Sequence, residues 1–170
     1  MTMETTDHAA LITALDKAGV EFIVIGGVAA IAHGSPRFTQ DVDAVYARTD
    51  DNLDRLVRAL RPLEPYLRGA PPGLPFEWSA KTLKRGLNFT LSTSAGSLDL
   101  FGEIVGGGRY EDLAAHATVM RIFGRRVRVL DLDALIRSKR AAGRVKDFEA
   151  LAELELLQEL AGRPGPRSTS

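Results

Sequence analysis

The sequence GGVAAIAHGSPRFTQDVD at residues 26–43 determines which fold this chain can adopt. It follows VEFIVI at 20–25, a short apolar and β-branched run that predicts a buried strand. The two glycines end that strand, and VAAIAH then suits a short helix that stops at Gly34. DVDAVYA at 41–47 alternates with period two and predicts another strand. Two carboxylates therefore follow a strand, a glycine turn and a short helix, and they stand on an otherwise apolar strand.

Helical and strand patterns alternate over the rest of the chain. Helices are expected at residues 7–19, 50–60, 131–142 and from 144 onward, and strands at 87–92, 97–104, 119–123 and 125–130. Residues 61–75 hold five prolines and two glycines, so we expect a loop there. Together these patterns predict a mixed α/β fold with a sheet of about four or five strands and flanking helices.

The composition excludes several classes of protein. With 170 residues, 45% of them hydrophobic and 26% charged, the chain matches one ordinary globular domain. Its formal net charge is zero, which argues against nucleic-acid binding through bulk charge alone. It has no cysteine, so any metal must bind oxygen or imidazole. Neither a signal-peptide pattern nor a run of about 18 apolar residues is present, so we expect a cytoplasmic protein without a membrane span.

Positive charge is nevertheless concentrated between Arg121 and Lys146. This segment holds nine basic residues and only two acidic ones, Asp131 and Asp133. A solvated surface balanced by acidic helices elsewhere explains the excess, and so does a basic wall that faces a phosphate-bearing ligand. The sequence leaves both interpretations open.

Asp41 and Asp43 are two residues apart on a predicted strand, so their side chains share one face, with Cα atoms roughly 7 Å apart. Two ionised carboxylates at this range repel each other, and a divalent cation that binds oxygens of both relieves the repulsion. A third candidate is Asp99, between Leu98 and Leu100 on another predicted strand. Three such carboxylates form a suitable cage for one or two Mg²⁺ ions, which retain water and bind substrate phosphates. Without a ligand, the same residues could form the solvent face of a strand.

The glycine pair fits the same chemistry. A turn without side chains lets backbone N–H groups approach a phosphate closely, and the helix that follows directs its positive end there. By itself, a glycine pair after a strand is most often only a tight turn. Its spacing differs from the dinucleotide pattern G-x-G-x-x-G, which argues against a dinucleotide-dependent oxidoreductase. The pair becomes informative because of the aspartates that follow it.

These segments resemble a known superfamily. GG, the DVD thirteen residues later and the distant LDL are similar to the pattern of the nucleotidyltransferase superfamily that includes DNA polymerase beta. The ending G-x-x-R-x-T-x-D-x-D resembles small relatives of the abortive-infection type IV toxin nucleotidyltransferases, and so does KRAAGRVKD at 139–147. The 170 residues are fewer than in those toxins, and we do not expect them to form the toxins' larger C-terminal helical region.

The resemblance implies an enzyme, a Mg²⁺-dependent nucleotidyltransferase that moves a nucleoside monophosphate from an NTP to a hydroxyl or phosphate acceptor. It makes Asp41, Asp43 and Asp99 the catalytic residues and metal ligands, and Asp99 could also accept the proton of the attacking hydroxyl. The expected nucleotide-binding residues are Gly26, Gly27, Arg37, Thr39, Lys139 and Arg144. A two-metal site is expected, with Mn²⁺ as the alternative to Mg²⁺. We expect a catalytic core at 1–130, C-terminal helices at 131–161 packed on the core and a flexible tail at 162–170.

Some of these residues have a second interpretation. Arg37 is either a phosphate contact or the ion partner of Asp41, and Thr39 suits a structural hydrogen bond better than catalysis. Whether Lys139 or Arg144 contacts phosphate stays open.

The sequence does not select the acceptor, which could be tRNA or another RNA, a protein or a small molecule such as an antibiotic. It also leaves open a toxin or antitoxin partner and the oligomeric state. The alternative from another functional class is a nucleotide-binding or regulatory module that keeps the fold without catalysis. The complete set of three aspartates argues against that alternative, because losing one ligand would suffice to inactivate such a site.

Overall fold

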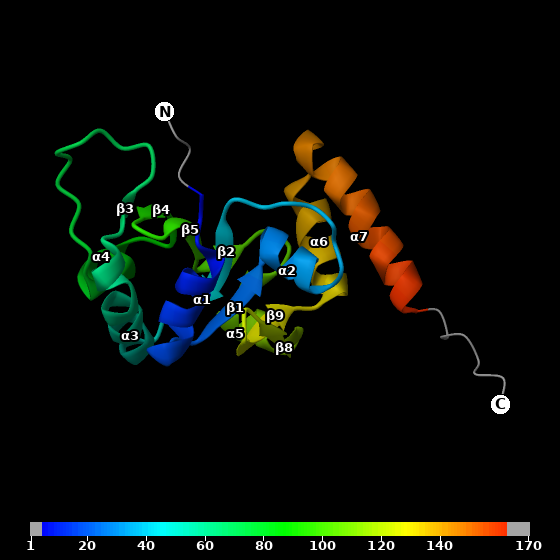
Figure 1. Ribbon diagram of the computed structural model, residues 1–170, viewed down its shortest axis with the longest axis horizontal. Coiled ribbons are helices and arrows are strands. Elements are labelled where there is room, and N and C mark those ends of the chain that lie inside the picture. Colours follow the sequence, from blue (N-terminus) through cyan, green and yellow to red (C-terminus); the bar gives the residue numbers. More distant parts are fainter. Residues whose placement is uncertain (1–4, 163–170) are drawn as a thin grey trace.

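A mixed sheet of seven strands runs through the centre of the protein (Figure 1). The structure is a computed structural model that describes residues 5–162. The sheet has the strand order β3-β4-β5-β2-β1-β9-β8, and a separate two-stranded ladder joins β6 and β7. The strands are β1 (Phe22–Ile25), β2 (Val42–Tyr46), β3 (Tyr66–Leu67), β4 (Asn88–Thr93), β5 (Gly96–Phe101), β6 (Glu103–Ile104), β7 (Gly108–Arg109), β8 (Ala117–Ile122) and β9 (Arg125–Leu130). The helices are α1 (His8–Lys17), α2 (Gly26–Ala32), α3 (Asp50–Leu60), α4 (Ala80–Arg85), α5 (Tyr110–Ala114), α6 (Leu132–Ala142) and α7 (Phe148–Ala161), with 3₁₀ turns η1 (Arg61–Leu63) and η2 (Val145–Asp147).

Strand pairing brings distant residues into one row. β1 is antiparallel to β2, β2 is parallel to β5, and β5 forms an antiparallel hairpin with β4. In this register Ile25 lies opposite Asp43, Asp43 opposite Asp99, and Asp99 opposite Thr90. Because paired residues point to the same side of a sheet, these four side chains share one face, which we call the site face.

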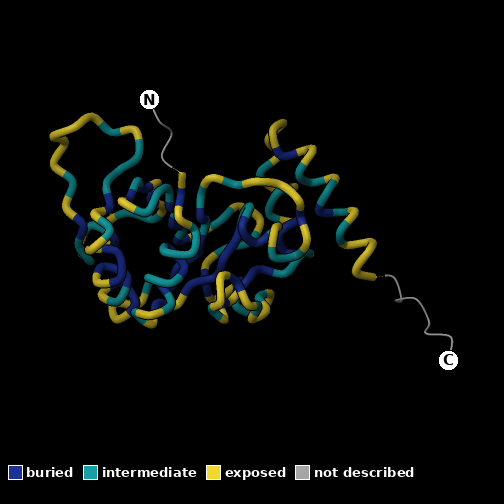
Figure 2. Tube along the Cα trace, viewed as in Figure 1, coloured by how far each residue is buried: buried dark blue, intermediate teal, exposed yellow. Residues whose placement is uncertain are grey.

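The opposite face of the same strands lies in the hydrophobic core. The adjacent row consists of Val24, Ala44, Leu100 and Phe89, none of which is more than 8% exposed. These residues belong to one cluster with the buried residues of α1 and α3. In Figure 2 the central strands are accordingly dark blue and the surrounding loops yellow. On the site face of β4, by contrast, Thr90 is exposed. The core thus anchors one face of the sheet and leaves polar groups accessible on the other.

Local sequence signals set the helix ends. The Asp7 carboxylate accepts a hydrogen bond from the Ala10 amide at 3.0 Å and begins α1. The Thr49 hydroxyl accepts one from the Asn52 amide at 3.3 Å and begins α3. Both are N-caps of the kind that satisfy free amides at a helix start.

The mixed α/β fold expected from the sequence is confirmed, but the sheet has seven strands where four or five were expected. The extra strand β3 lies in the proline-rich segment, where Tyr66 pairs with Ser92 and Leu67 with Leu91. The expected strand at 97–104 is interrupted after Phe101, and residues 103–104 pair with β7 instead. The sequence pattern also misses α4 and α5, which have six and five residues and so span too few turns to show a helical period.

The two C-terminal helices pack against each other at one end of the sheet (Figure 1). The helix expected from residue 144 begins as the turn η2 and becomes α-helical at Phe148. In α7 Leu154 is buried, whereas Leu156 and Leu160 are about half exposed. Most of the tail expected at 162–170 lies outside the described residues. Within residues 5–162, no helix has the length and apolar character needed to cross a membrane.

Candidate functional site

Asp41, Asp43 and Asp99 come together on the site face, and we call them the acidic triad. Asp43 and Asp99 are direct neighbours on the parallel strands β2 and β5, and Asp41 immediately precedes β2. One carboxylate oxygen from each residue lies within 4.8 Å of the other two. All three residues are partly exposed. The two-residue spacing on one strand and the parallel pairing of a second strand therefore produce a cluster of three carboxylates that solvent can reach.

Gly26 and Gly27 leave the space that the aspartates and their loop need. Gly26 has φ +63°, and a β-carbon added there would lie 2.1 Å from Oδ2 of Asp43. A β-carbon on Gly27 would lie 2.5 Å from Oγ1 of Thr39, which donates a hydrogen bond to the Asp41 carbonyl at 3.4 Å. Both separations are far shorter than a van der Waals contact. The glycine pair therefore lets the start of α2 pack directly against the residues around the triad.

Burial, together with the neighbouring negative charges, raises the pKa of the Asp43 carboxyl to about 7. Burial is the largest cause because it disfavours the charged form, and the charges of Asp99 and Asp41 add to it. Lys139 acts in the opposite direction but does not compensate. Near neutral pH the Asp43 carboxyl is therefore only partly ionised, and a divalent cation that binds it would displace the remaining proton.

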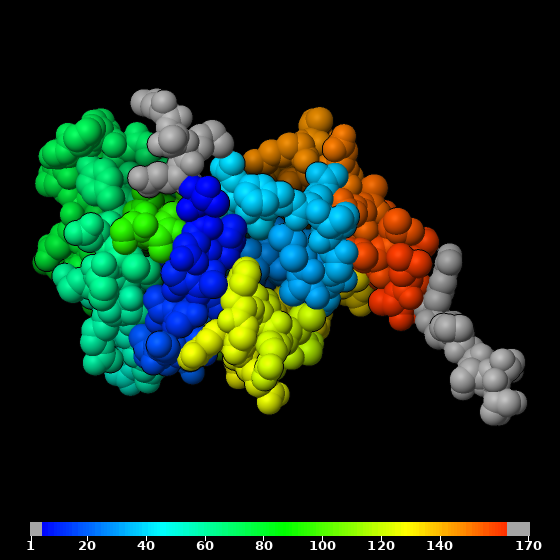
Figure 3. Space-filling model, in the orientation of Figure 1, coloured from blue at the N-terminus to red at the C-terminus, as the bar shows by residue number. Residues whose placement is uncertain are grey.

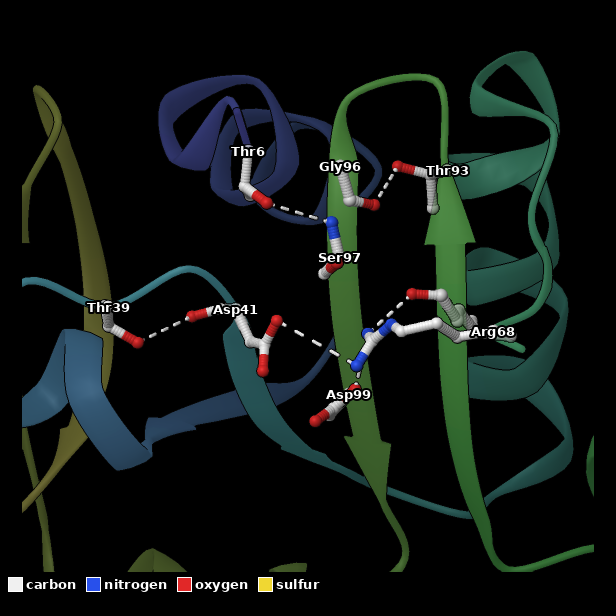
Figure 4. Close-up of polar contacts among 9 residues, drawn as sticks. Thr6, Thr39, Asp41, Arg68, Thr93, Gly96, Ser97 and Asp99 are labelled. Carbon is white, nitrogen blue, oxygen red and sulfur yellow. Dashed lines mark hydrogen bonds and ion pairs between the residues drawn. The ribbon is translucent and has the colours of Figure 1, made fainter. Parts of the chain in front are cut away.

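Arg68 is the functional candidate that the sequence did not reveal. Its Nη2 donates a hydrogen bond to Oδ1 of Asp99 at 2.7 Å, and its Nη1 lies 3.9 Å from Oδ1 of Asp41 (Figure 4). Arg68 directly follows β3, in the segment that was expected to be a loop. Its position depends on the pairing of β3 with β4, and no local period in the sequence indicates this pairing.

Arg37 does not pair with Asp41, which corrects one of its two expected roles. Its guanidinium instead forms ion pairs with Glu153 and Glu149 of α7, and Glu153 also accepts a hydrogen bond from the Ser35 hydroxyl at 2.7 Å. The hydrogen bonds from Ser35 and Arg37 lower the pKa of Glu153. Figure 3 shows the cyan segment that contains these residues lying against the orange-red α7. Arg37 thus joins the loop before the triad to the last helix.

Lys139 and Arg144 converge on one buried carboxylate. Nζ of Lys139 lies 3.5 Å from Oδ1 of Asp147, and Nε of Arg144 donates to Oδ2 of the same residue at 2.8 Å. Asp147 is only 7% exposed. Burial acts to raise its pKa, but the hydrogen bond from Arg144 and the charge of Lys139 outweigh burial, and the net pKa is lowered. Both side chains that were expected to contact phosphate are therefore held in place by Asp147, and their geometry favours neither over the other as the phosphate contact.

Two cavities open beside the triad, and Gly26, Lys139 and Arg144 line both of them. The first has a volume of about 420 Å³ and includes Asp43, with mostly apolar walls from β5, the segment around β6 and α6. The second has a volume of about 450 Å³ and lies between the start of α2, residues 35–39 and α7, and its walls combine polar and charged side chains with apolar ones. A phosphate-bearing ligand in either cavity would meet the same two cations.

The triad fits a divalent cation such as Mg²⁺. This ion prefers carboxylate oxygens and keeps several waters, so three converging carboxylates suffice when a substrate supplies further oxygens. The pKa of Asp43 is raised first by burial and then by the charges of Asp99 and Asp41, as expected where carboxylates crowd into a partly buried site. His33 is not part of this donor set, because its Nε2 is hydrogen-bonded to the Leu130 carbonyl at 2.9 Å.

Comparison with known proteins gives results only at the level of structure. No protein-family model matches the sequence, and no curated protein matches it significantly. Among solved structures, the lincosamide antibiotic adenylyltransferase LnuA with bound lincomycin is similar at a TM-score of 0.58 and 12% identity, over 91% of this chain and 99% of LnuA. ANT(2″)-Ia in complex with adenylyl-2″-tobramycin is similar at 0.52 and 15% identity, over 89% of this chain and 92% of that one. An antigenic nucleotidyltransferase-like protein from Paracoccidioides brasiliensis follows at 0.51 and 17% identity, over 92% and 78%.

These similarities extend over most of each chain, although few residues are identical. They agree with the fold implied by the resemblance that the glycine pair and the aspartates carry. None of these three is an abortive-infection toxin, so that narrower resemblance stays a prediction. The chain has a nucleotidyltransferase fold.

Proposed function

We propose that this protein is a nucleotidyltransferase, which uses Mg²⁺ to transfer a nucleoside monophosphate from an NTP to an acceptor hydroxyl. The supporting observation is the convergence of Asp41, Asp43 and Asp99 beside Gly26 within a nucleotidyltransferase fold. Unrelated activities share folds, so the triad supports the proposal more strongly than the fold does.

In this proposal the three carboxylates of the triad hold Mg²⁺, or Mn²⁺ in its place. When bound, one or two divalent ions would neutralise phosphate charge and make the attacking hydroxyl easier to deprotonate. Asp43 must lose its proton before it can act as a ligand, so metal affinity should rise with pH up to about 7.

The triphosphate would bind along Gly26 and Gly27, with Lys139 and Arg144 as its cationic contacts. Gly26, Lys139 and Arg144 line both cavities, Gly27 lines the second, and Asp147 holds both cations through its carboxylate. A fixed cation stabilises the charge that develops on the transferring phosphate more effectively than a mobile one, because it needs no reorganisation during the reaction.

The chemical step forms a bond between the acceptor oxygen and the α-phosphorus. The bond from the α-phosphorus to the bridging oxygen breaks, and pyrophosphate leaves with the electron pair. The acceptor proton passes to Asp99, which lies at the edge of the triad toward β4. Thr90 is exposed beside Asp99 on the site face, and the acceptor would approach over this part of the sheet.

Two of the similar structures indicate which substrates to test first. One is an adenylyltransferase with bound lincomycin, and the other contains adenylyl-2″-tobramycin. We therefore propose ATP as the donor and a small hydroxyl-bearing molecule as the acceptor. Transfer RNA, other RNA and proteins are the alternative acceptors, and modification of one of these would be required for a toxin–antitoxin role.

The test is transfer of label from α-³²P-labelled ATP, and then from the other NTPs, to small molecules, total RNA and cell lysate with Mg²⁺. Asp41→Ala should abolish transfer while the far-ultraviolet circular dichroism spectrum stays unchanged. Asp54→Ala is the matched control, since Asp54 is exposed on α3, away from the triad. Transfer that survives Asp41→Ala would show that Asp41 is not a metal ligand. Nucleotide binding without transfer in any mixture would favour a non-catalytic module.

A further inference from the structure

Arg68 brings a positive charge to the triad from the end of β3, and it is separate from Lys139 and Arg144, the cations that line both cavities. Its guanidinium bonds to Asp99 and lies near Asp41, whereas Lys139 and Arg144 are paired with Asp147. With three carboxylates and one guanidinium in contact, the cluster carries a formal charge of about −2 when fully ionised. This negative charge balances the charge of one divalent cation but not the charge of two.

Several contacts hold Arg68 in this position. Its backbone amide donates to the Thr90 carbonyl at 2.9 Å, which extends the pairing of β3 with β4 by one residue. Its Nη2 also donates to the Leu91 carbonyl at 2.7 Å. The side chain is 28% exposed, and its Nε is buried without a hydrogen-bond partner. Arg68 is therefore attached to the sheet through its backbone amide and through Nη2, and swinging away from Asp99 would break the hydrogen bonds of Nη2 with the carboxylate and the strand.

We propose that Arg68 is a built-in counter-cation of the metal site, which fixes the carboxylate of Asp99 and weakens divalent-cation binding until a nucleotide adds its own negative charge. This inference rests on the proposed function, because it takes the triad to be a metal site. Removing the positive charge should tighten binding of a metal ion in the absence of nucleotide. A purely structural role for Arg68 predicts the opposite, since a disordered Asp99 would bind metal more weakly.

The experiment is a titration of the full chain with Mn²⁺ alone, in which electron paramagnetic resonance measures the concentration of free Mn²⁺. It is carried out at about pH 8, where Asp43 is largely ionised. Arg68→Gln and Arg68→Met both remove the charge, and Met keeps the apolar stem, so one variant suffices if the other fails to fold. We expect each variant to bind Mn²⁺ at least about tenfold more tightly than the wild type. The free energy of this change is only a part of the Coulomb energy between two charges a few ångströms apart. Arg68→Lys should bind like the wild type, and so should Arg58→Gln, which removes an exposed arginine of α3.

Unchanged or weaker Mn²⁺ binding in both uncharged variants, with a wild type that binds, would overturn the role of Arg68 and leave the proposed function standing. If neither the wild type nor the variants bind Mn²⁺, the metal site itself is wrong, and the proposed function fails with it. Binding by the uncharged variants alone would support the inference in its strongest form.

Discussion

Gly26 and Asp43 share a space that holds only one side chain, because a β-carbon on Gly26 would lie 2.1 Å from Oδ2 of Asp43. Ile25 and Asp43 are paired in the sheet, so the chain turns at Gly26 directly above the carboxylate. The positive φ of Gly26 makes this turn and costs a residue with a side chain extra energy. The absence of a side chain at Gly26 thus leaves room for the carboxylate of Asp43 on the next strand.

Gly26→Ala should therefore abolish metal binding as well as transfer. The new methyl group displaces the Asp43 carboxylate, and calorimetric titration with Mn²⁺ should show no binding. Gly124→Ala is the matched control: Gly124 has φ +76° but has no atom near its would-be β-carbon. That control should lose only about 1 kcal/mol of stability, the usual cost of the backbone conformation, and keep its metal affinity. Equal Mn²⁺ affinities in the two variants would contradict the steric explanation.

The raised pKa of Asp43 predicts a pH-dependent stability in the metal-free protein. The folded-state pKa is about 7 and the ordinary value is 3.8, so between these values the folded state binds more protons than the unfolded state. The contribution of Asp43 to the free energy of unfolding should be fully present below about pH 4 and lost as the pH rises to about 7. Urea unfolding in EDTA should thus show wild-type stability falling relative to Asp43→Asn over this range. A difference that is constant with pH would rule out the raised pKa.

Lys139→Met should weaken NTP binding by about tenfold, the equivalent of one charge-assisted contact. Lys139 lines both cavities, and Asp147 keeps its bond to Arg144 after the substitution, so the fold should be retained. Isothermal titration with a non-hydrolysable NTP measures the effect. Lys81→Met, on the exposed side of α4, should leave affinity unchanged. If both variants bind equally well, Lys139 does not contact the nucleotide.

Glu153→Gln should loosen the attachment of α7 to the loop before the triad. Glu153 accepts hydrogen bonds from Ser35 and Arg37, and the amide that replaces it keeps the size but loses the charge. Hydrogen exchange measured by mass spectrometry should show faster exchange in α7 and across residues 33–40. Glu159→Gln, an exposed change on the same helix, provides the comparison. The same loosening is expected in the wild type at low pH. Because the pKa of Glu153 is lowered, its charged carboxylate stabilises the folded protein above the ordinary pKa, and this stabilisation is lost as the carboxylate becomes protonated.

Local patterns were sufficient to predict the mixed α/β class and to single out the three aspartates of the triad. The order of strand, glycine pair, short helix and strand is written in consecutive residues, and the spacing of Asp41 and Asp43 places both on one face. Asp99 was recognisable because it interrupts the apolar residues of its own strand. The structure then shows that its strand lies next to β2, in the register that brings Asp99 opposite Asp43.

The partners of Arg68 and Arg37 could not be predicted in the same way. Arg68 reaches the triad only because the two-residue strand β3 pairs with β4, and two residues are too few to show alternation. Arg37 meets Glu153 across 116 positions of sequence. Such contacts depend on the packing of whole elements, which residue spacing does not encode.

The position of β1 has a consequence for biosynthesis. This strand is entirely buried and lies between β2 and β9, yet β9 is encoded far downstream at residues 125–130. In a nascent chain that still lacks β9, β1 is an apolar edge strand with unpaired backbone groups, and such edges promote aggregation. We expect ribosome-bound intermediates to require chaperone protection until residues 125–130 have emerged from the ribosome.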